Sequence, residues 1–164
     1  IDYRLSSDST IEAISEKTIQ NEFGEFNLIV WRDNIKDEYH FSLTKGDLSK
    51  VESPLVRVQT QSILQDTLGI EEMGKNWSIR KSIERISKEE AGLFVLINHR
   101  DAKSYWLNKL KDKEVEPKKN RKVIGVGSQI CRALNLKKIT VLGTPTKYNA
   151  LSGFNIEITG FVNE

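Results

Sequence analysis

The side chains most able to do chemistry lie in a polar loop, residues 61–76, with the sequence QSILQDTLGIEEMGKN. This loop follows an apolar, strand-like segment and precedes a helical pattern, where α/β proteins usually place ligand-binding groups. It contains no cysteine and no histidine. Asp66, Glu71 and Glu72 could bind a hard cation, but their spacing matches no metal-binding pattern, and such carboxylates are mostly solvated. Residue chemistry alone therefore favours an ordinary polar connection.

Gly125 and Gly127 form a second candidate, a Gly-x-Gly pair at the start of a helical pattern over residues 126–134. Backbone N–H groups at such a position can bind a phosphate. The dinucleotide fingerprint also needs a strand directly before the pair and a third glycine. Here a lysine-rich segment precedes the pair, and Ile130 occupies the third position. We therefore interpret the glycines as a site of tight helix packing or a turn.

His40, His99 and Cys131 could in principle supply a Cys/His nucleophilic pair. Cys131 lies next to Ile130 on the apolar side of its helical pattern, and free cysteines are commonly buried. Because no motif supports the pair, we expect Cys131 to be a core residue.

A basic cluster, KKNRK at residues 118–122 with Lys111 and Lys113, is the remaining candidate. It has no interleaved aromatic residue, and Asp112, Glu114 and Glu116 offset its charge. The net charge of the whole chain is only +2. We therefore do not expect nucleic-acid binding.

Composition describes a chain of 164 residues, 38% hydrophobic and 29% charged, which is enough for one domain with a substantial core. No apolar run approaches the about 20 residues that a membrane helix requires. The single cysteine excludes an internal disulfide and a cysteine-based zinc site within one chain. A reducing, cytoplasmic location fits this usage.

Apolar periodicity predicts the elements that must hold these groups. Strands are expected at residues 26–33, 39–47, 54–60, 93–97, 137–143 and 155–162. Helices are expected at residues 77–90, 102–111 and 126–134, and the first has Ile79, Ile83 and Ile86 on one face. Residues 1–22 are interpreted as a linker with at most a short strand near its end, and residues 112–122 as a solvated connection. This order predicts one α/β domain over residues 23–164, a mixed sheet flanked by helices.

Six segments in a fixed order resemble the GTP cyclohydrolase II family. They are FGEFNLIVWRD, EYHFSLTKGDLS, PLVRVQTQSILQDTLG, LNKLK, GVGSQICRALNLKKITVL and LSGFNIEI, which extend from residue 23 to residue 158. No single segment is specific to this family, but the order of the six segments over most of the chain is. The family makes the first committed intermediate of riboflavin from GTP. The resemblance therefore implies the mixed α/β fold of that family and a place in riboflavin biosynthesis.

The family pattern for the polar loop is V-R-V-H-S-E-C-x-x-x-D-x-x-G-S-x-R-C-D-C-G, and its three cysteines hold a catalytic zinc. Aligned without gaps, these cysteines fall on Ser62, Met73 and Lys75. A hydroxyl and a thioether are weak zinc ligands, and an ammonium group repels a cation. We therefore expect no zinc and no other cofactor.

The rest of the family pattern is retained only in part. Arg57, Asp66 and Gly69 keep their family identities, whereas Gln59 and Gln61 replace a histidine and a glutamate.

The family's nucleotide-binding elements are also altered. In the R-Q-E-G-R-x-x-G element, Arg100 replaces the glutamate that would bind guanine, and Ala102 replaces an arginine. The segment with the family's tyrosine and Asp-x-Arg pair is shortened to residues 112–122 and lacks that pair. Of the late T-N-N-P-x-K loop, Pro145 and Lys147 remain. No catalytic residue is therefore assigned, and Arg57, Asp66, Arg100 and Lys147 are the candidate ligand-binding residues.

The N-terminal residues Ile1 to Arg4 resemble the linker between a 3,4-dihydroxy-2-butanone 4-phosphate synthase domain and a cyclohydrolase II domain in bifunctional proteins. With the missing initial methionine, this predicts the C-terminal domain of such a fusion, whose synthase activity would lie upstream. The resemblance further predicts a homodimer and leaves a nucleotide or flavin ligand open.

Three functional hypotheses follow. The first is a non-catalytic or regulatory cyclohydrolase II-like domain. The second is an active GTP-opening hydrolase with relocated catalytic groups, with candidates Arg57, Asp66, His99, Arg100, Lys103 and Lys147. The third is a phosphate or nucleic-acid binding module formed by residues 111–122.

Overall fold

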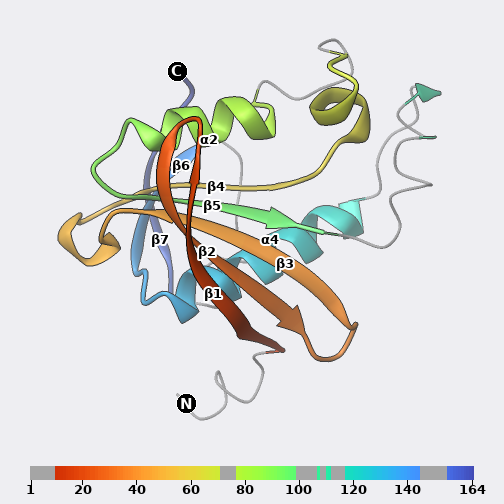
Figure 1. The fold of residues 1–164 in the computed structure, drawn as a ribbon. Coiled ribbons are helices and arrows are strands. Elements are labelled where there is room, and N and C mark those ends of the chain that lie inside the picture. The colour runs from red at the N-terminus through yellow and green to blue at the C-terminus, as the bar shows by residue number, and fades with distance from the viewer. Residues whose placement is uncertain (1–9, 71–76, 99–106, 108–109, 112–116, 145–154) are drawn as a thin grey trace.

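The computed structural model describes residues 10–70, 77–98, 107, 110–111, 117–144 and 155–164, with the backbone alone described for residues 117–122. A seven-stranded mixed sheet with the strand order β1-β2-β3-β5-β4-β6-β7 forms the centre of the fold (Figure 1). The strands are β1 Ile11–Asn21, β2 Gly24–Asp33, β3 Glu38–Lys45, β4 Leu55–Thr60, β5 Gly92–Ile97, β6 Lys138–Leu142 and β7 Glu157–Val162. Strands β1, β2, β3 and β5 pair antiparallel, whereas β5, β4, β6 and β7 pair parallel. Every predicted strand is confirmed, as is the mixed α/β class.

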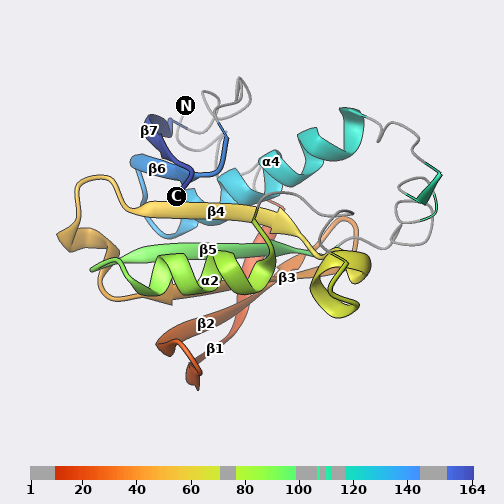
Figure 2. The same cartoon turned by 90° about the horizontal axis from the view of Figure 1, so that it is seen from above.

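Two helices cover opposite faces of the sheet. Figure 2 shows α2 (Ile79–Ser87) and α4 (Pro117–Ala133) on either side of β4 and β5. One core cluster joins Val126 and Ile130 of α4 to Val95 of β5, and the other joins Ile86 of α2 to Phe94. Because β5 is covered on both faces, its sequence GLFVLI is continuously apolar rather than alternating.

Helix α2 confirms the strongest helical prediction. Ser78 is its N-cap, and the Ser78 side chain accepts a hydrogen bond from the Lys81 backbone N–H at 3.1 Å. Ile86 belongs to the buried core cluster on this face, and the partly buried Ile79 and Ile83 pack against it. The helix is shorter than the predicted range 77–90.

The linker prediction for residues 1–22 is wrong for residues 11–21. These residues form β1, an 11-residue edge strand that pairs with β2 from Ile11↔Asp33 to Asn21↔Gly24. Residues 12–18 are all exposed, so this strand lacks the apolar alternation by which strands are recognised. Its pairing with β2 defines the strand.

The interpretation of residues 112–122 as a solvated connection is also wrong in part. Helix α4 begins at Pro117, nine residues before the predicted start. Proline has no N–H to lose in the first turn of a helix, so Pro117 starts this helix rather than interrupting it. Most of the predicted helix over residues 102–111 lies outside the described residues.

Two short helical turns, η1 (Leu48–Lys50) and η2 (Ile63–Thr67), complete the described elements. Within the described part of the chain, no helix has the length and apolar character needed to cross a membrane.

Candidate functional site

The candidate site lies where the parallel strands β4 and β5 end. Thr60 and Ile97 are paired residues at the carboxyl ends of these strands. From this edge β4 continues into η2, whose N-cap is Ser62, the residue that the alignment predicts at the family's first zinc-ligand position. In α/β sheets, ligands usually bind outside the carboxyl ends of the strands, so this edge is the first place to search.

Asp66 holds two separate parts of this edge together. One carboxylate oxygen accepts a hydrogen bond from the Ser62 backbone N–H at 2.8 Å. The other accepts from the Ile79 backbone N–H at 2.9 Å, at the first turn of α2. A carboxylate at a helix N-terminus also stabilises the helix electrostatically. Asp66 thus connects the beginning of the polar loop to the helix that follows it.

Ser62, which the alignment predicts at the position of the family's first cysteine, acts as a helix cap. Its hydroxyl oxygen accepts a hydrogen bond from the Gln65 backbone N–H at 3.3 Å. Among the residues that the structure describes, no group of three or more His, Cys, Asp or Glu side chains could hold a metal ion. The donors described at this edge do not fit a zinc centre. Met73 and Lys75 lie outside the described residues.

Arg57 and Gln59 belong to a hydrogen-bond network between the sheet and α2. The Arg57 Nε donates to the Gln59 Oε1 at 2.8 Å, and its Nη1 donates to the Leu142 carbonyl oxygen at 3.1 Å. The same Gln59 Oε1 accepts from the Ser82 hydroxyl at 2.8 Å. Gln59 and Ser82 are both buried. These bonds use Arg57, a candidate ligand-binding residue, to join β4 to the end of β6.

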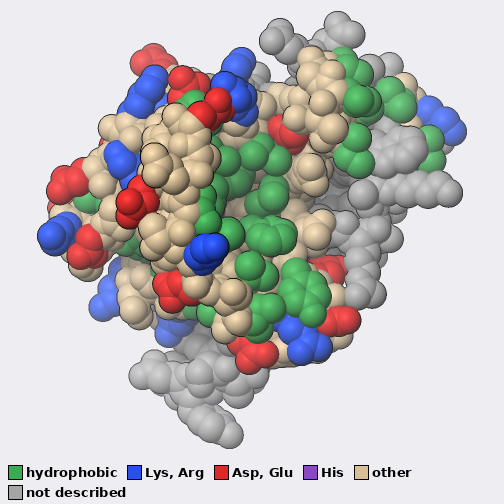
Figure 3. All heavy atoms as spheres, viewed as in Figure 1, with side chains coloured by type: hydrophobic (Ala, Val, Ile, Leu, Met, Phe, Trp, Pro, Cys, Tyr) green, Lys and Arg blue, Asp and Glu red, His purple; other side chains and the backbone are tan. Residues whose placement is uncertain are grey.

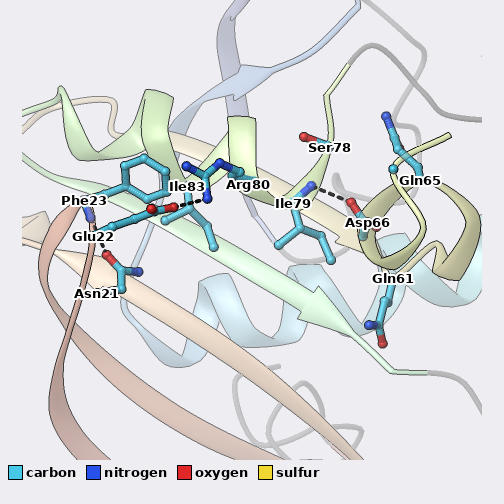
Figure 4. A pocket seen from close by; sticks show the side chains of 11 residues that line it. Asn21, Glu22, Phe23, Gln61, Gln65, Asp66, Ser78, Ile79, Arg80 and Ile83 are labelled. Carbon is cyan, nitrogen blue, oxygen red and sulfur yellow. Dashed lines mark hydrogen bonds and ion pairs between the residues drawn. The ribbon is translucent and has the colours of Figure 1, made fainter. Parts of the chain in front are cut away.

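A cleft of about 590 Å³ opens beside this edge, between α2, η2 and the tip of the β1–β2 hairpin (Figure 4). Its lining consists of Asn21, Glu22, Phe23, Gln61, Gln65, Asp66, Gly69, Ser78, Ile79, Arg80 and Ile83. We call it the hairpin–helix cleft. Asp66 lines the cleft, whereas Arg57 is not among its lining residues.

The hairpin tip is fastened to α2 at one end of the cleft. The Arg80 guanidinium forms an ion pair with Glu22 and lies over the Phe23 ring, 5.3 Å from its centroid. Sequence reasoning missed Glu22, Phe23 and Arg80 because β1 was interpreted as a linker. The signal in the sequence for a hairpin was Gly24, because glycine tolerates the positive φ that tight turns often need. In the structure Gly24 has a φ of 125° and lies where β1 turns into β2.

The other candidates have structural roles where they are described. Cys131 is buried in the main core, and burial raises the pKa of its thiol to about 12, so almost none of it is the reactive thiolate at neutral pH. Gly127 lies inside α4, and a Cβ there would come within 2.8 Å of Val58 Cγ1, which confirms tight packing. His40 is buried, and its Nδ1 accepts from the Asn98 backbone N–H at 3.0 Å.

Several remaining candidates lie outside the described residues. These are His99, Arg100, Lys103 and Lys147. The side chains of residues 118–122, the centre of the basic cluster, are likewise not described.

Comparison with known proteins decides the family. The sequence matches the family model described as GTP cyclohydrolase II over residues 12–163. The chain belongs to the GTP cyclohydrolase II family. The match includes β1, and it agrees with the resemblance carried by the six ordered segments.

Relatives within this family are named for riboflavin biosynthesis. The chain is 32% identical to the 3,4-dihydroxy-2-butanone 4-phosphate synthase of Pseudomonas aeruginosa, over 99% of this chain and 46% of that protein. It is 29% identical to riboflavin biosynthesis protein RibBA of Cytophaga hutchinsonii, over 97% of this chain and 43% of that protein.

A solved structure shows the same fold. The two-domain 3,4-dihydroxy-2-butanone 4-phosphate synthase RibBX of A. baumannii matches with a TM-score of 0.66 at 26% identity. The match covers 99% of this chain and 43% of that chain. The chain thus spans about half the length of the curated relatives it matches.

Proposed function

We propose that this chain is a non-catalytic member of the GTP cyclohydrolase II family that serves riboflavin biosynthesis by binding or regulation. The observation that carries this proposal is the bonding of Ser62. At the first zinc-ligand position, the hydroxyl caps η2 instead of offering a thiolate. A catalytic zinc site needs three protein ligands in a fixed geometry, and Ser62, Met73 and Lys75 supply no thiolate.

The bonds made by the retained residues support the same conclusion. Both oxygens of Asp66 accept backbone N–H groups, and Arg57 donates to Gln59 and to the Leu142 carbonyl. Each side chain thus stabilises the scaffold at the former site. Arg57 does not share the lining of the hairpin–helix cleft with Asp66, so the geometry does not favour a relocated catalytic group built from these two residues.

The charge changes in sequence remove the other two requirements of the family's reaction. Arg100 stands where a carboxylate would bind guanine, and the shortened segment over residues 112–122 lacks the Asp-x-Arg pair. A reversed charge at a hydrogen-bonding position is strongly unfavourable for the original ligand. The proposal therefore combines loss of the metal, of base recognition and of phosphate chemistry.

The partner that we propose is a 3,4-dihydroxy-2-butanone 4-phosphate synthase domain in the cytoplasm. The support is that relatives at 32% and 33% identity carry that name, while this chain covers 46% of their length. A homodimer stays a prediction from the family resemblance.

The test measures metal content and turnover together. The purified chain is dialysed against zinc, analysed for bound metal, and incubated with GTP while formate and pyrophosphate are measured. We expect less than stoichiometric zinc and no formate above a protein-free blank. Stoichiometric zinc together with GTP-dependent formate release would overturn the proposal.

A further inference from the structure

We propose that the hairpin–helix cleft binds an uncharged, planar heteroaromatic ring with amide-like edges, and that it disfavours phosphorylated forms of the same ring. This inference rests on the proposed non-catalytic binding function and names the chemical class of ligand for that site. The experiment below uses binding alone, so its failure is separate from any result on zinc or turnover.

The cleft has the size and the walls of a small-molecule site. Its volume of about 590 Å³ lies within the usual range for such sites. Ile79 and Ile83, one helical turn apart, project from α2 into the space that Phe23 bounds from the hairpin (Figure 4). In Figure 3 hydrophobic side chains gather across the middle of the molecular face that carries α2 and the hairpin. An apolar ring can displace water from this wall.

Amide groups lie away from the hairpin end of the cleft. Figure 4 shows Gln61 and Gln65 at the η2 end, while Phe23 closes the hairpin end. A glutamine amide both donates and accepts hydrogen bonds, so it can pair with the alternating N–H and C=O groups at the edge of a heterocycle. Amides carry no net charge and give such a ring orientation without attracting an anion.

The cationic group in the described lining of the cleft is already paired with a carboxylate. The Arg80 guanidinium is paired with Glu22, and it is the single cationic side chain among the eleven lining residues. The described lining contains two carboxylates, Asp66 and Glu22, and one guanidinium, so its net charge is negative.

The N-terminus of α2, which would otherwise attract a phosphate, is also satisfied. Asp66 accepts the Ile79 N–H, and the Ser78 hydroxyl accepts the Lys81 N–H. A phosphate entering here would meet net negative charge and occupied donors. The neutral form of a ring compound is therefore the better ligand.

Two matched ligand pairs test this inference. Riboflavin and its 5′-phosphate share one ring system, and guanosine and GTP share another. Each pair differs only in phosphate groups. Titrations of the full chain follow flavin fluorescence for the first pair and calorimetry for the second, at low and at physiological salt. We expect at least one uncharged compound to bind at least about tenfold more tightly than its phosphorylated counterpart.

Substitutions locate the binding. Ile83→Arg places a bulky cation in the cleft wall and should abolish binding of the uncharged ring. Glu84→Arg adds the same side chain at the next, exposed position, which does not line the cleft, and should leave the dissociation constant within about twofold. Phe23→Ala, at the hairpin tip, removes one wall without altering the helix and should weaken binding at least about tenfold.

The outcomes are decisive in both directions. Circular dichroism and melting temperature establish whether each variant is folded. If Ile83→Arg does not fold, binding by Phe23→Ala alone tests whether the ligand occupies the cleft. The inference is overturned if none of the four compounds binds, if neither uncharged compound binds more tightly than its phosphorylated counterpart, or if Phe23→Ala binds as the unaltered chain does.

Discussion

At the scale of single residues, the candidate site contains polar side chains that stabilise the scaffold. Asp66, Ser62, Gln59 and Arg57 each satisfy backbone or side-chain hydrogen bonds within the chain. Buried polar groups are expensive to leave unpaired, so such residues stabilise the fold whether or not the site binds a metal. Their retention in the sequence is therefore explained by the fold.

The first prediction concerns Asp66→Asn. The amide has one acceptor oxygen where the carboxylate has two, so either the Ser62 or the Ile79 N–H loses its partner. We expect the free energy of unfolding to fall by about 1–3 kcal/mol. Urea denaturation at pH 7 measures the change.

Asp47→Asn is the matched control for that substitution. Asp47 also accepts a backbone N–H, from Ser49 at 3.0 Å, but it is fully exposed on the short turn η1. We expect it to change stability much less than Asp66→Asn does. Equal effects of the two substitutions would contradict the role assigned to Asp66.

The second prediction concerns the reactivity of Cys131. Burial raises the pKa of its thiol to about 12, from an ordinary value of 9.0. At pH 8.5 the folded chain should react with iodoacetamide far more slowly than the chain in 6 M urea, because the thiolate is the nucleophile. Mass spectrometry of alkylation against time measures both rates.

The same shift predicts the direction of a pH effect. The unfolded chain loses the thiol proton near pH 9 and the folded chain only near pH 12, so the contribution of Cys131 to stability is complete below pH 9 and is lost as the pH rises towards 12. Cys131→Ala should remove this part of the slope. An unchanged slope between pH 9 and pH 11 would contradict the assignment.

At the scale of elements, α4 packs against β4 at close range on its face of the sheet. Gly127 faces Val58 of β4 so closely that a Cβ would lie 2.8 Å from Val58 Cγ1 and 3.1 Å from its Cγ2. Gly125, two residues earlier in the same helix, has open space around it. The Gly-x-Gly pair therefore contains one packing glycine and one that is free of such contacts.

The third prediction contrasts these glycines. Gly127→Ala should lower the free energy of unfolding by about 1–3 kcal/mol through overpacking. Gly125→Ala should raise it by about 0.5–1 kcal/mol, because alanine favours the helix interior. Chemical denaturation of both variants measures the contrast, and the double variant Gly127→Ala/Val58→Ala should show favourable coupling. Destabilisation by both single substitutions would contradict this packing.

At the scale of the whole molecule, the chain has the fold of its relatives, and the alteration of the family's metal-binding positions stays a prediction from the alignment. The fold matches a two-domain synthase at a TM-score of 0.66, and the family match extends over residues 12–163. Zinc in the family joins positions that are distant along the polar loop, from 62 to 75. Here Asp66 connects the two ends of that loop through backbone bonds at Ser62 and Ile79.

The fourth prediction restores the metal. The triple variant Ser62→Cys, Met73→Cys and Lys75→Cys should bind about one zinc per chain, because it recreates three thiolate ligands on a retained scaffold. It should still release no formate from GTP, since Arg100 remains where a carboxylate is required. Metal analysis after gel filtration and a formate assay measure the two properties.

The matched control for the restored site is the double variant that keeps Ser62. With two thiolates it should lose most of its zinc during gel filtration, because structural and catalytic sites need at least three protein ligands. If the triple variant also fails to retain zinc, the alignment of Ser62, Met73 and Lys75 with the family's ligands is contradicted.

Local sequence patterns predicted the strands and helices whose apolar residues form a regular face or a continuous run. Most of these elements, such as β2, β3 and α2, place apolar residues on one face, whereas β5 is a continuous apolar run because both of its faces are covered. The family was likewise evident from the order of segments, and the family model confirms it. None of this required knowledge of long-range contacts.

Only the tertiary structure decided the extent of β1, the start of α4 and the hairpin–helix cleft. β1 is exposed along most of its length, so its strand conformation comes from pairing with β2 and leaves no periodic signal. The contact of Arg80 with Glu22 and Phe23 joins residues nearly 60 positions apart, and hairpin register and helix packing bring them together. The order of segments in the sequence by itself determined the family, and it predicts the loss of the family's thiolates. The cleft forms because segments distant in sequence meet in the fold, and the periodicity of a single segment carries no information about such contacts.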